Sequence, residues 1–240
     1  MPIREKEDGK GGGVLEEVSI LFTIPYINLH ITEMTVMMWI IMGIIILWAF
    51  LATRNMQLVP KGVQASGEVF VDAINNFVKD SMPHKWKSYA PYIGTVVLFL
   101  GLMNTCGMFF LRLGEHTIIK PPTRNFAIPV AMAVMTILIV IGSGIKVKGI
   151  KGFIKSLFEP MWFLFPFNLL EFIIKPLSLS MRLFGNILGA FILMEMIING
   201  LPLIFPAIAS LYFDLFDGLL QAFIFMFLTT LYIAEEVEEE

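Results

Sequence analysis

Residues 166–189 read PFNLLEFIIKPLSLSMRLFGNILG, an apolar stretch with an arginine, Arg182, inside it. Its polar and small residues recur every three or four positions, so they share one face of an α-helix that turns about 100° per residue. They are Asn168, Glu171, Lys175, Ser178, Arg182, Asn186 and Gly189. Because a charge at the centre of a bilayer costs roughly 2.5–17 kcal/mol, this face must meet protein or a water-filled cavity.

The composition is that of an integral membrane protein. Of the 240 residues, 57% are hydrophobic and only 15% are charged, whereas about 25% of the residues of a soluble domain are charged. This balance excludes a disordered chain and a soluble α/β fold. The formal charge of −3 says little about partners, because acidic residues gather near the two ends of the chain.

The residue types present argue against several kinds of site. Cys106 is the only cysteine, so no disulfide forms within the chain. His30, His84 and His116 lie far apart, and none has a second metal ligand at helical spacing. No Gly-x-x-x-x-Gly-Lys-Ser/Thr loop is present. We therefore expect no cofactor, metal, nucleotide or nucleic acid on this chain.

Apolar runs predict an all-α integral membrane protein with five membrane-inserted helices. About 20 apolar residues at 1.5 Å per residue cross the roughly 30 Å hydrocarbon layer of a bilayer. The predicted spans are 34–53, 89–112, 126–145 and, in a hairpin within 163–234, the stretches 166–200 and 203–234. A continuous helix over 203–234 would be about 48 Å long, so this last hairpin is expected to be long and tilted. Asn104 and Thr105, inside the second span, are interpreted as groups that pack helices together.

An amphipathic helix is predicted at 61–80. Apolar residues recur at helical spacing from Val63 to Phe77, opposite a polar face. This pattern is typical of a helix that lies along a membrane surface. A helix packed on the protein's own loops has the same pattern, and the sequence leaves both possibilities open.

Basic residues predict the orientation in the membrane. The first connection between spans carries five lysines and arginines, the second three, the third four, and the turn near Pro202 none. Because positively charged loops stay in the cytoplasm, the first and third connections are predicted to be cytoplasmic. Residues 1–33 are then an extracytoplasmic segment, and 235–240 are an acidic cytoplasmic tail.

A second polar stripe lies in the last predicted span. Ser210, Asp214, Asp217, Gln221 and Tyr232 fall on one face of an otherwise apolar helix. Two neighbouring helices with one polar stripe each can line a water-filled or proton-conducting path, which lipid-facing helices cannot form.

Two motifs make this sequence resemble a known family. They are Arg182-Leu-Phe-Gly-Asn186, preceded by Lys175-Pro-Leu-Ser-Leu, and Gln221-Ala-Phe-Ile-Phe-Met-Phe-Leu-Thr229 before Tyr232. Both are similar to signature helices of subunit a of F-type ATP synthases. The likeness extends over the last third of the chain at motif level and over the remainder by the order of the spans.

The resemblance implies a partner and a role. In that family the long hairpin lies against a ring of rotor helices, the c-ring, each with a carboxylate at mid-membrane. Arg182 would face this carboxylate and separate two ion half-channels, with Asn186 and Gln221 beside it. The chain would be a non-catalytic subunit that couples H⁺ or Na⁺ flow to rotation and ATP synthesis. It would be held by peripheral-stalk b subunits in a bacterial plasma membrane.

Further residues of the two stripes are expected to take part in ion translocation. Lys175 falls at a position where relatives carry lysine, and Glu171 one turn before it forms a favourable i,i+4 pair. Such a pair is equally typical of side chains that only reach toward the membrane surface. Ser178 and Ser210 extend the two stripes.

The sequence departs from the family pattern in the outer half-channel. Many relatives carry Glu or His nine residues after the arginine, where this chain has Phe191, and the nearest acid is Glu195. Asp214 occupies a position where some relatives carry histidine. We expect Asp214, Asp217 and Glu195 to line the outer half-channel, although Glu195 lies about 140° from Arg182 around the helix.

Two other classes of function use buried polar residues of this kind. A secondary transporter would use Arg182 as an anion site, but such carriers usually show internal repeats, and no second copy of the Arg182 motif is present. An intramembrane enzyme would need a Ser/His, paired-Asp or metal constellation, whereas Asp214 and Asp217 lie one turn apart on a single helix. The transporter is the alternative that remains.

Overall fold

The computed structural model describes residues 20–24, 29–54, 56–109, 122, 125–158, 161–200 and 205–238. Within these ranges five helices are long and apolar enough to cross a bilayer, which confirms the predicted all-α membrane architecture. The helices are α1 (Glu33–Thr53), α2 (Val63–Ser81), α3 (Trp86–Phe109), α4 (Ala127–Ser156), α5 (Phe165–Gly200), α6 (Phe205–Ser210) and α7 (Gly218–Glu238). A π-helical stretch, Leu211–Asp217, joins α6 to α7.

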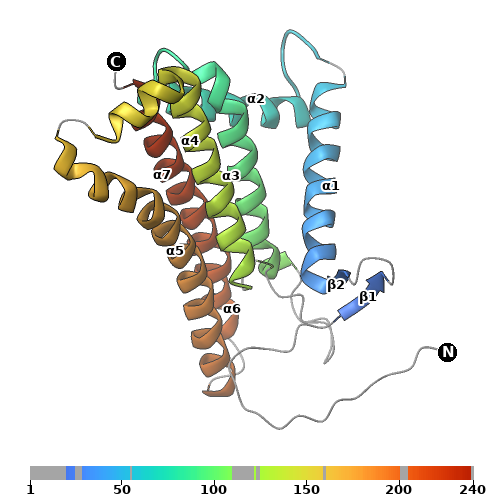
Figure 1. Cartoon of the computed structure of the whole chain (residues 1–240). Coiled ribbons are helices and arrows are strands. Elements are labelled where there is room, and N and C mark those ends of the chain that lie inside the picture. The colour runs from blue at the N-terminus through green and yellow to red at the C-terminus, as the bar shows by residue number, and fades with distance from the viewer. Residues whose placement is uncertain are drawn as a thin grey trace.

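The spanning helices form a bundle with outlying members (Figure 1). α3, α4 and α7 lie side by side at its centre, while α1 stands apart and contacts α2 and α3. α5 runs obliquely past α4, and the segment from α6 to α7 returns beside it, so the predicted long, inclined hairpin is present. α1 and α7 end at the same end of the bundle, and α1 starts at the other.

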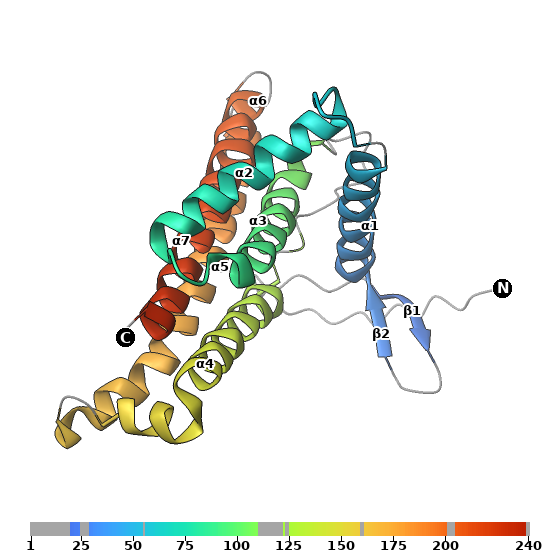
Figure 2. The ribbon, with the colours of Figure 1, turned by 90° about the horizontal axis from the view of Figure 1, so that it is seen from above.

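α2 crosses the ends of the spanning helices, as Figures 1 and 2 show together. Its apolar face packs on the protein: the ring of Phe77 lies edge-on to Phe223 of α7, and Phe70 lies edge-on to Trp48 of α1. The amphipathic helix predicted at 61–80 is therefore confirmed. Phe70 and Phe77 of its apolar face thus contact the protein's own helices, while Val63 at the start of that face is exposed.

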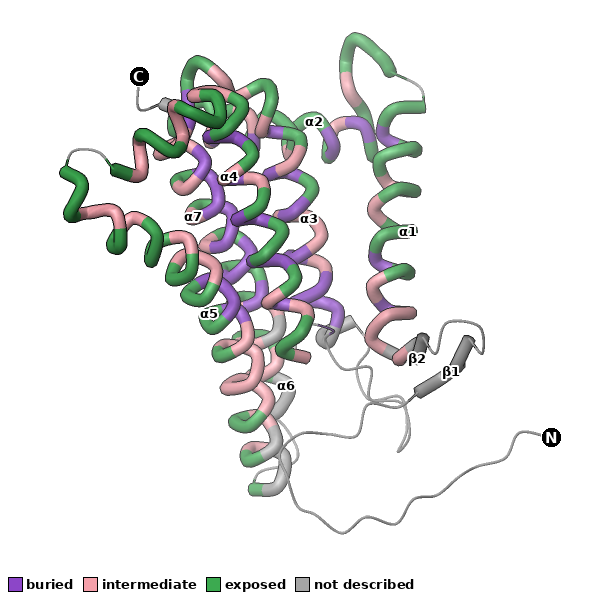
Figure 3. The backbone as a smooth tube through the Cα atoms, viewed as in Figure 1, coloured by how far each residue is buried: buried purple, intermediate pink, exposed green. Residues whose placement is uncertain are grey.

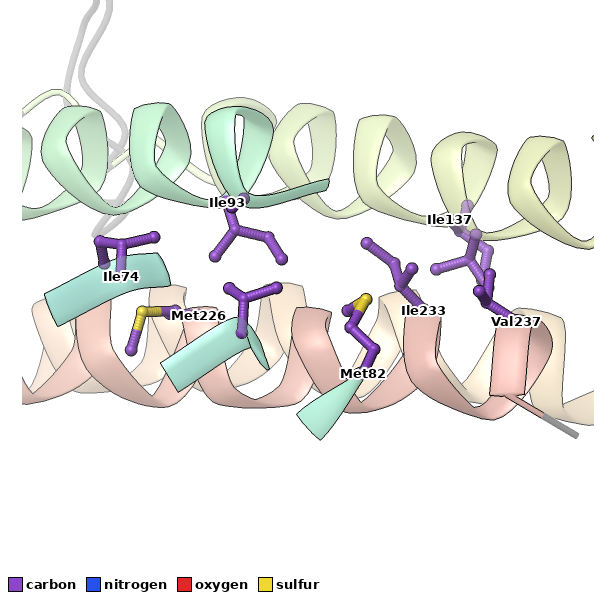
Figure 4. Packing of buried hydrophobic residues seen from close by; sticks show 10 residues of the cluster. Ile74, Met82, Ile93, Ile137, Met226, Ile233 and Val237 are labelled. Atoms are coloured by element: carbon purple, nitrogen blue, oxygen red, sulfur yellow. The ribbon is translucent and has the colours of Figure 1, made fainter. Parts of the chain in front are cut away.

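The core lies among α2, α3, α4 and α7. Its largest cluster consists of Ile74, Val78, Met82, Ala90, Ile93, Ile137, Val140, Met226, Ile233 and Val237 (Figure 4). A second cluster attaches α5 to the bundle through Leu179 and Leu183, and in a membrane-spanning helix such contacts stabilise the bundle by van der Waals packing. α1 and the outer side of α5 are mostly exposed (Figure 3), which leaves apolar surface for lipid or for other subunits.

α4 is longer than the predicted third span, 126–145. Gly149 has a φ of 70° and turns the helix, which then continues to Ser156. Glycine adopts a positive φ at little cost because it has no Cβ. The basic connection expected after Ile145 is therefore helical on both sides of a kink.

A two-stranded antiparallel ribbon precedes α1, where the sequence predicted no element. Strand β1 (Ile20–Ile24) pairs with β2 (Leu29–Thr32). Helix α1 follows β2 directly, with Thr32 as its N-cap: the Thr32 hydroxyl accepts a hydrogen bond from Thr35 N over 3.4 Å.

Candidate functional site

Arg182 lies on the outer side of α5, next to the residues that attach this helix to the bundle. Leu179 and Leu183 are 2% and 0% exposed and pack against α3, α4 and α7. Arg182 itself is exposed, as are Met181 and Ser178 on the same stretch. No side chain in the described part of the chain forms a hydrogen bond or ion pair with Arg182. Among the described residues the Arg182 guanidinium therefore has no partner, and it lies on a largely apolar outer surface.

One turn further along α5, Asn186 joins the two long helices of the hairpin. Its Nδ2 donates a hydrogen bond to Gln221 Oε1 on α7 over 2.9 Å. Gln221 is 2% exposed and lies beside Ala222 of the second cluster. The two polar residues that the motifs place near Arg182 thus contact each other, and their bond joins α5 to α7.

A charged cluster lies two turns before Arg182 on α5. Lys175 Nζ is 3.1 Å from Glu171 Oε2 and 2.7 Å from Glu235 Oε2 on α7. The same ammonium lies 5.3 Å from the centroid of the Tyr232 ring. The Glu171–Lys175 pair is therefore one arm of a bridge between α5 and α7. The second carboxylate, that of Glu235, belongs to the segment 235–240, which is predicted to be an acidic tail. In the structure α7 continues into this segment as far as Glu238.

The next residue of α7, Glu236, pairs with a different helix. Its Oε2 is 3.5 Å from Lys148 Nζ on α4, and the two side chains are 13% and 12% exposed. Consecutive helical residues point about 100° apart, so neighbouring carboxylates can reach two different helices. The sequence shows the lysines and the acidic helix end, but no spacing in it indicates which of them pair.

The acidic residues predicted for the outer half-channel lie toward the turn of the hairpin, before Gln221. Asp217 ends the π-helical stretch and is partly buried, and Ser210 precedes that stretch and is also partly buried. The side chains of Asp214 and Glu195 lie outside the described residues. A π-helical stretch is a common feature of functional sites in helices, and no sequence signal predicted it.

Asn104 holds α3 against the start of α7, as its interpretation as a packing group requires. Its Nδ2 donates a hydrogen bond to Gly218 O over 3.2 Å. A Cβ on Gly218 would lie 3.2 Å from Asn104 Cβ, so the absence of a side chain permits this close approach. Thr105 instead donates to Gly101 O of its own helix, over 2.7 Å.

Polar groups thus occur at three levels of an otherwise apolar hairpin: the Lys175 bridge, Arg182 with the Asn186–Gln221 bond, and Asp217 near the turn. Among the described residues, no three His, Cys, Asp or Glu side chains are grouped to hold a metal ion.

The profile of the family described as ATP synthase A chain matches residues 35–234. The chain belongs to this family. The match runs from α1 into α7 and includes both motifs on which the resemblance rests.

Named relatives cover most of the chain. It is 34% identical over 199 residues to ATP synthase subunit a of Moorella thermoacetica, which is 83% of this chain and 88% of that protein. It is 33% identical over 211 residues to ATP synthase subunit a 1 of Crocosphaera subtropica, 87% of each chain. It is 32% identical over 211 residues to the protein named ATP synthase subunit a, sodium ion specific, of Propionigenium modestum, 85% of this chain and 73% of that one.

Membership of the ATP synthase A chain family gives the general role. The chain is a multi-pass membrane component of the ATP synthase complex, with a part in ion transport and ATP synthesis. A carrier that works alone, the alternative left by the sequence, does not fit this membership.

Proposed function

We propose that this subunit guides H⁺ or Na⁺ through two half-channels to the c-ring and so couples ion flow to rotation and ATP synthesis. The observation that carries the proposal is the position of Arg182. It is exposed on the outer side of α5, beside the Asn186–Gln221 hydrogen bond, and it pairs with no described side chain of its own chain. Nucleotide chemistry is left to other subunits of the complex.

A guanidinium on a lipid-facing surface requires a partner. Arginine stays protonated in proteins, and a charge left at the bilayer centre costs roughly 2.5–17 kcal/mol. A carboxylate on a passing rotor helix supplies the missing negative charge, and Arg182 in turn favours its ionised form. The rotor carboxylate then releases its ion on reaching Arg182 and binds another beyond it. The same positive charge repels free cations, so ions do not leak directly between the half-channels.

The antiparallel hairpin supports two separate access routes. Residues before Arg182 on α5 meet residues after Gln221 on α7, as in the Lys175–Glu235 bridge. Residues near the turn lie on the other side of Arg182. We assign to the cytoplasmic route Glu171, Lys175 and Ser178, and to the outer route Asp214, Asp217, Ser210 and Glu195.

The basic connections support an orientation in a bacterial plasma membrane. The first and third connections lie at the end of the bundle where α7 ends (Figure 1), and basic loops stay in the cytoplasm. The C-terminal end of α7 is then cytoplasmic and residues 1–33 lie outside. The exposed surfaces of α1 and α5 remain for lipid, the c-ring and the peripheral-stalk b subunits.

The test is the substitution Arg182→Ala in the whole complex. We expect the complex to assemble with its c-ring and to lose ATP-driven ion pumping and ATP synthesis in reconstituted vesicles. Lys151→Ala is the control, because it removes one exposed positive charge from α4 and should leave both activities unchanged. Synthesis that survives Arg182→Ala would remove the basis of the proposal.

A further inference from the structure

Three groups that attract cations surround one point between α5 and α7. The carboxylates of Glu235 and Glu171 lie 2.7 Å and 3.1 Å from that point, and the Tyr232 ring centroid lies 5.3 Å from it. The point is filled by the ammonium of Lys175, whose side chain is 13% exposed. The carboxylate side chains are 38% and 52% exposed, so their outer sides reach solvent.

We propose that this is a cation-binding position and that Lys175 is a tethered cation that keeps mobile cations out of it. Two carboxylate oxygens are ligands that hard cations such as Ca²⁺ prefer, at distances of about 2.3–2.6 Å, with water completing the shell. An aromatic face adds a further attraction for a cation. The compact lysine ammonium, with three donors, can satisfy both carboxylates at once.

The carboxylates do not depend on Lys175 for their approximate positions. Glu171 lies on α5, which is attached to the bundle through Leu179 and Leu183. Glu235 lies on α7 between Ile233 and Val237, which are 0% and 3% exposed in the largest core cluster. Removing the ammonium should therefore leave two carboxylates facing one space.

The consequence for transport rests on the proposed function. A carboxylate pair beside the cytoplasmic route would hold a multivalent cation that entered it, because two negative charges attract one cation more strongly than a single charge does. A lysine occupies the pair without being able to diffuse away. Ions can then pass along the route without a competing cation being trapped there.

Cation binding is measured on the purified complex, without turnover. The probe is Tb³⁺, which binds Ca²⁺ sites and luminesces when a nearby tyrosine, here Tyr232, is excited. We expect Lys175→Met to give a new Tb³⁺ signal that Ca²⁺ displaces with a dissociation constant of about 10⁻⁴–10⁻³ M. The native chain and Lys175→Arg should lack this signal, because each keeps a tethered cation.

The matched control removes the ligands as well as the ammonium. The triple variant Lys175→Met, Glu171→Gln, Glu235→Gln should lose the Tb³⁺ signal.

A Lys175→Met complex without the new Tb³⁺ signal overturns the proposal. If that complex does not assemble, Lys175→Gln offers the same test with a polar end group. Because binding is measured without transport, its outcome is independent of the Arg182 test of the proposed function.

Discussion

One amide–amide hydrogen bond joins Asn186 to Gln221: Asn186 Nδ2 donates to Gln221 Oε1 over 2.9 Å. Gln221 is 2% exposed, so removing its partner leaves a buried polar group, at a cost of about 1–3 kcal/mol. Removing both amides leaves no unsatisfied group and costs less. We expect Asn186→Leu and Gln221→Leu each to lower the unfolding temperature of the chain, and the double variant to recover part of the loss.

Cys106 provides the measurement for this pair. It is the only cysteine of the chain and is 5% exposed, so its alkylation reports unfolding as the temperature rises. The unfolding temperatures of the two single variants and the double variant form a mutant cycle. A double variant whose loss equals the sum of the single losses would contradict a direct interaction.

At the level of elements, α4 fits against α7 because residue 144 is glycine. A Cβ on Gly144 would lie 2.8 Å from Phe153 Cε2 and 2.9 Å from Glu236 Oε2. Gly144→Ala should therefore displace the carboxylate, weaken its pair with Lys148 and destabilise the chain by about 1–3 kcal/mol. Alkylation during heating measures the change.

The control for Gly144 lies two residues earlier on the same helix. Nothing lies within 4 Å of a Cβ added to Gly142. Gly142→Ala should leave stability unchanged or raise it by about 0.4–1 kcal/mol, because alanine loses less backbone entropy on folding. If Gly144→Ala and Gly142→Ala change the stability equally, the close contacts of a Cβ at position 144 do not determine stability.

The helices could be predicted wherever apolar length alone decides them. A bilayer requires about 20 apolar residues, and the predicted span 34–53 differs from α1, Glu33–Thr53, by one residue. The continuation of α4 to Ser156 could not be predicted, because the conformation of Gly149 depends on where the following segment packs. The ribbon before α1 is too short for its pattern to stand out from a loop.

For the whole molecule, sequence periodicity shows which residues share a helix face but not which faces meet. The Asn186–Gln221 contact could be expected only through the family resemblance, since 35 positions separate the two residues. The bridges from Lys175 to Glu235 and from Lys148 to Glu236 join residues 60 and 88 positions apart. Such contacts depend on how α4, α5 and α7 pack, which no local pattern encodes.

The outer face of the hairpin should therefore be tested as an assembly surface. Gly185 lies three residues after Arg182 on the same side of α5, is exposed, and has nothing within 4 Å of an added Cβ. If the c-ring covers this face, Gly185→Cys should form a disulfide with a cysteine at mid-membrane on a rotor helix, since bridging requires Cα atoms within about 7 Å. The cross-link should stop ATP-driven pumping until a reductant is added.

Gly43 of α1 has equally open surroundings, and α1 stands apart from the hairpin (Figure 1), so Gly43→Cys should not cross-link. Cross-linking from Gly43 but not from Gly185 would place the ring on the other side of the molecule.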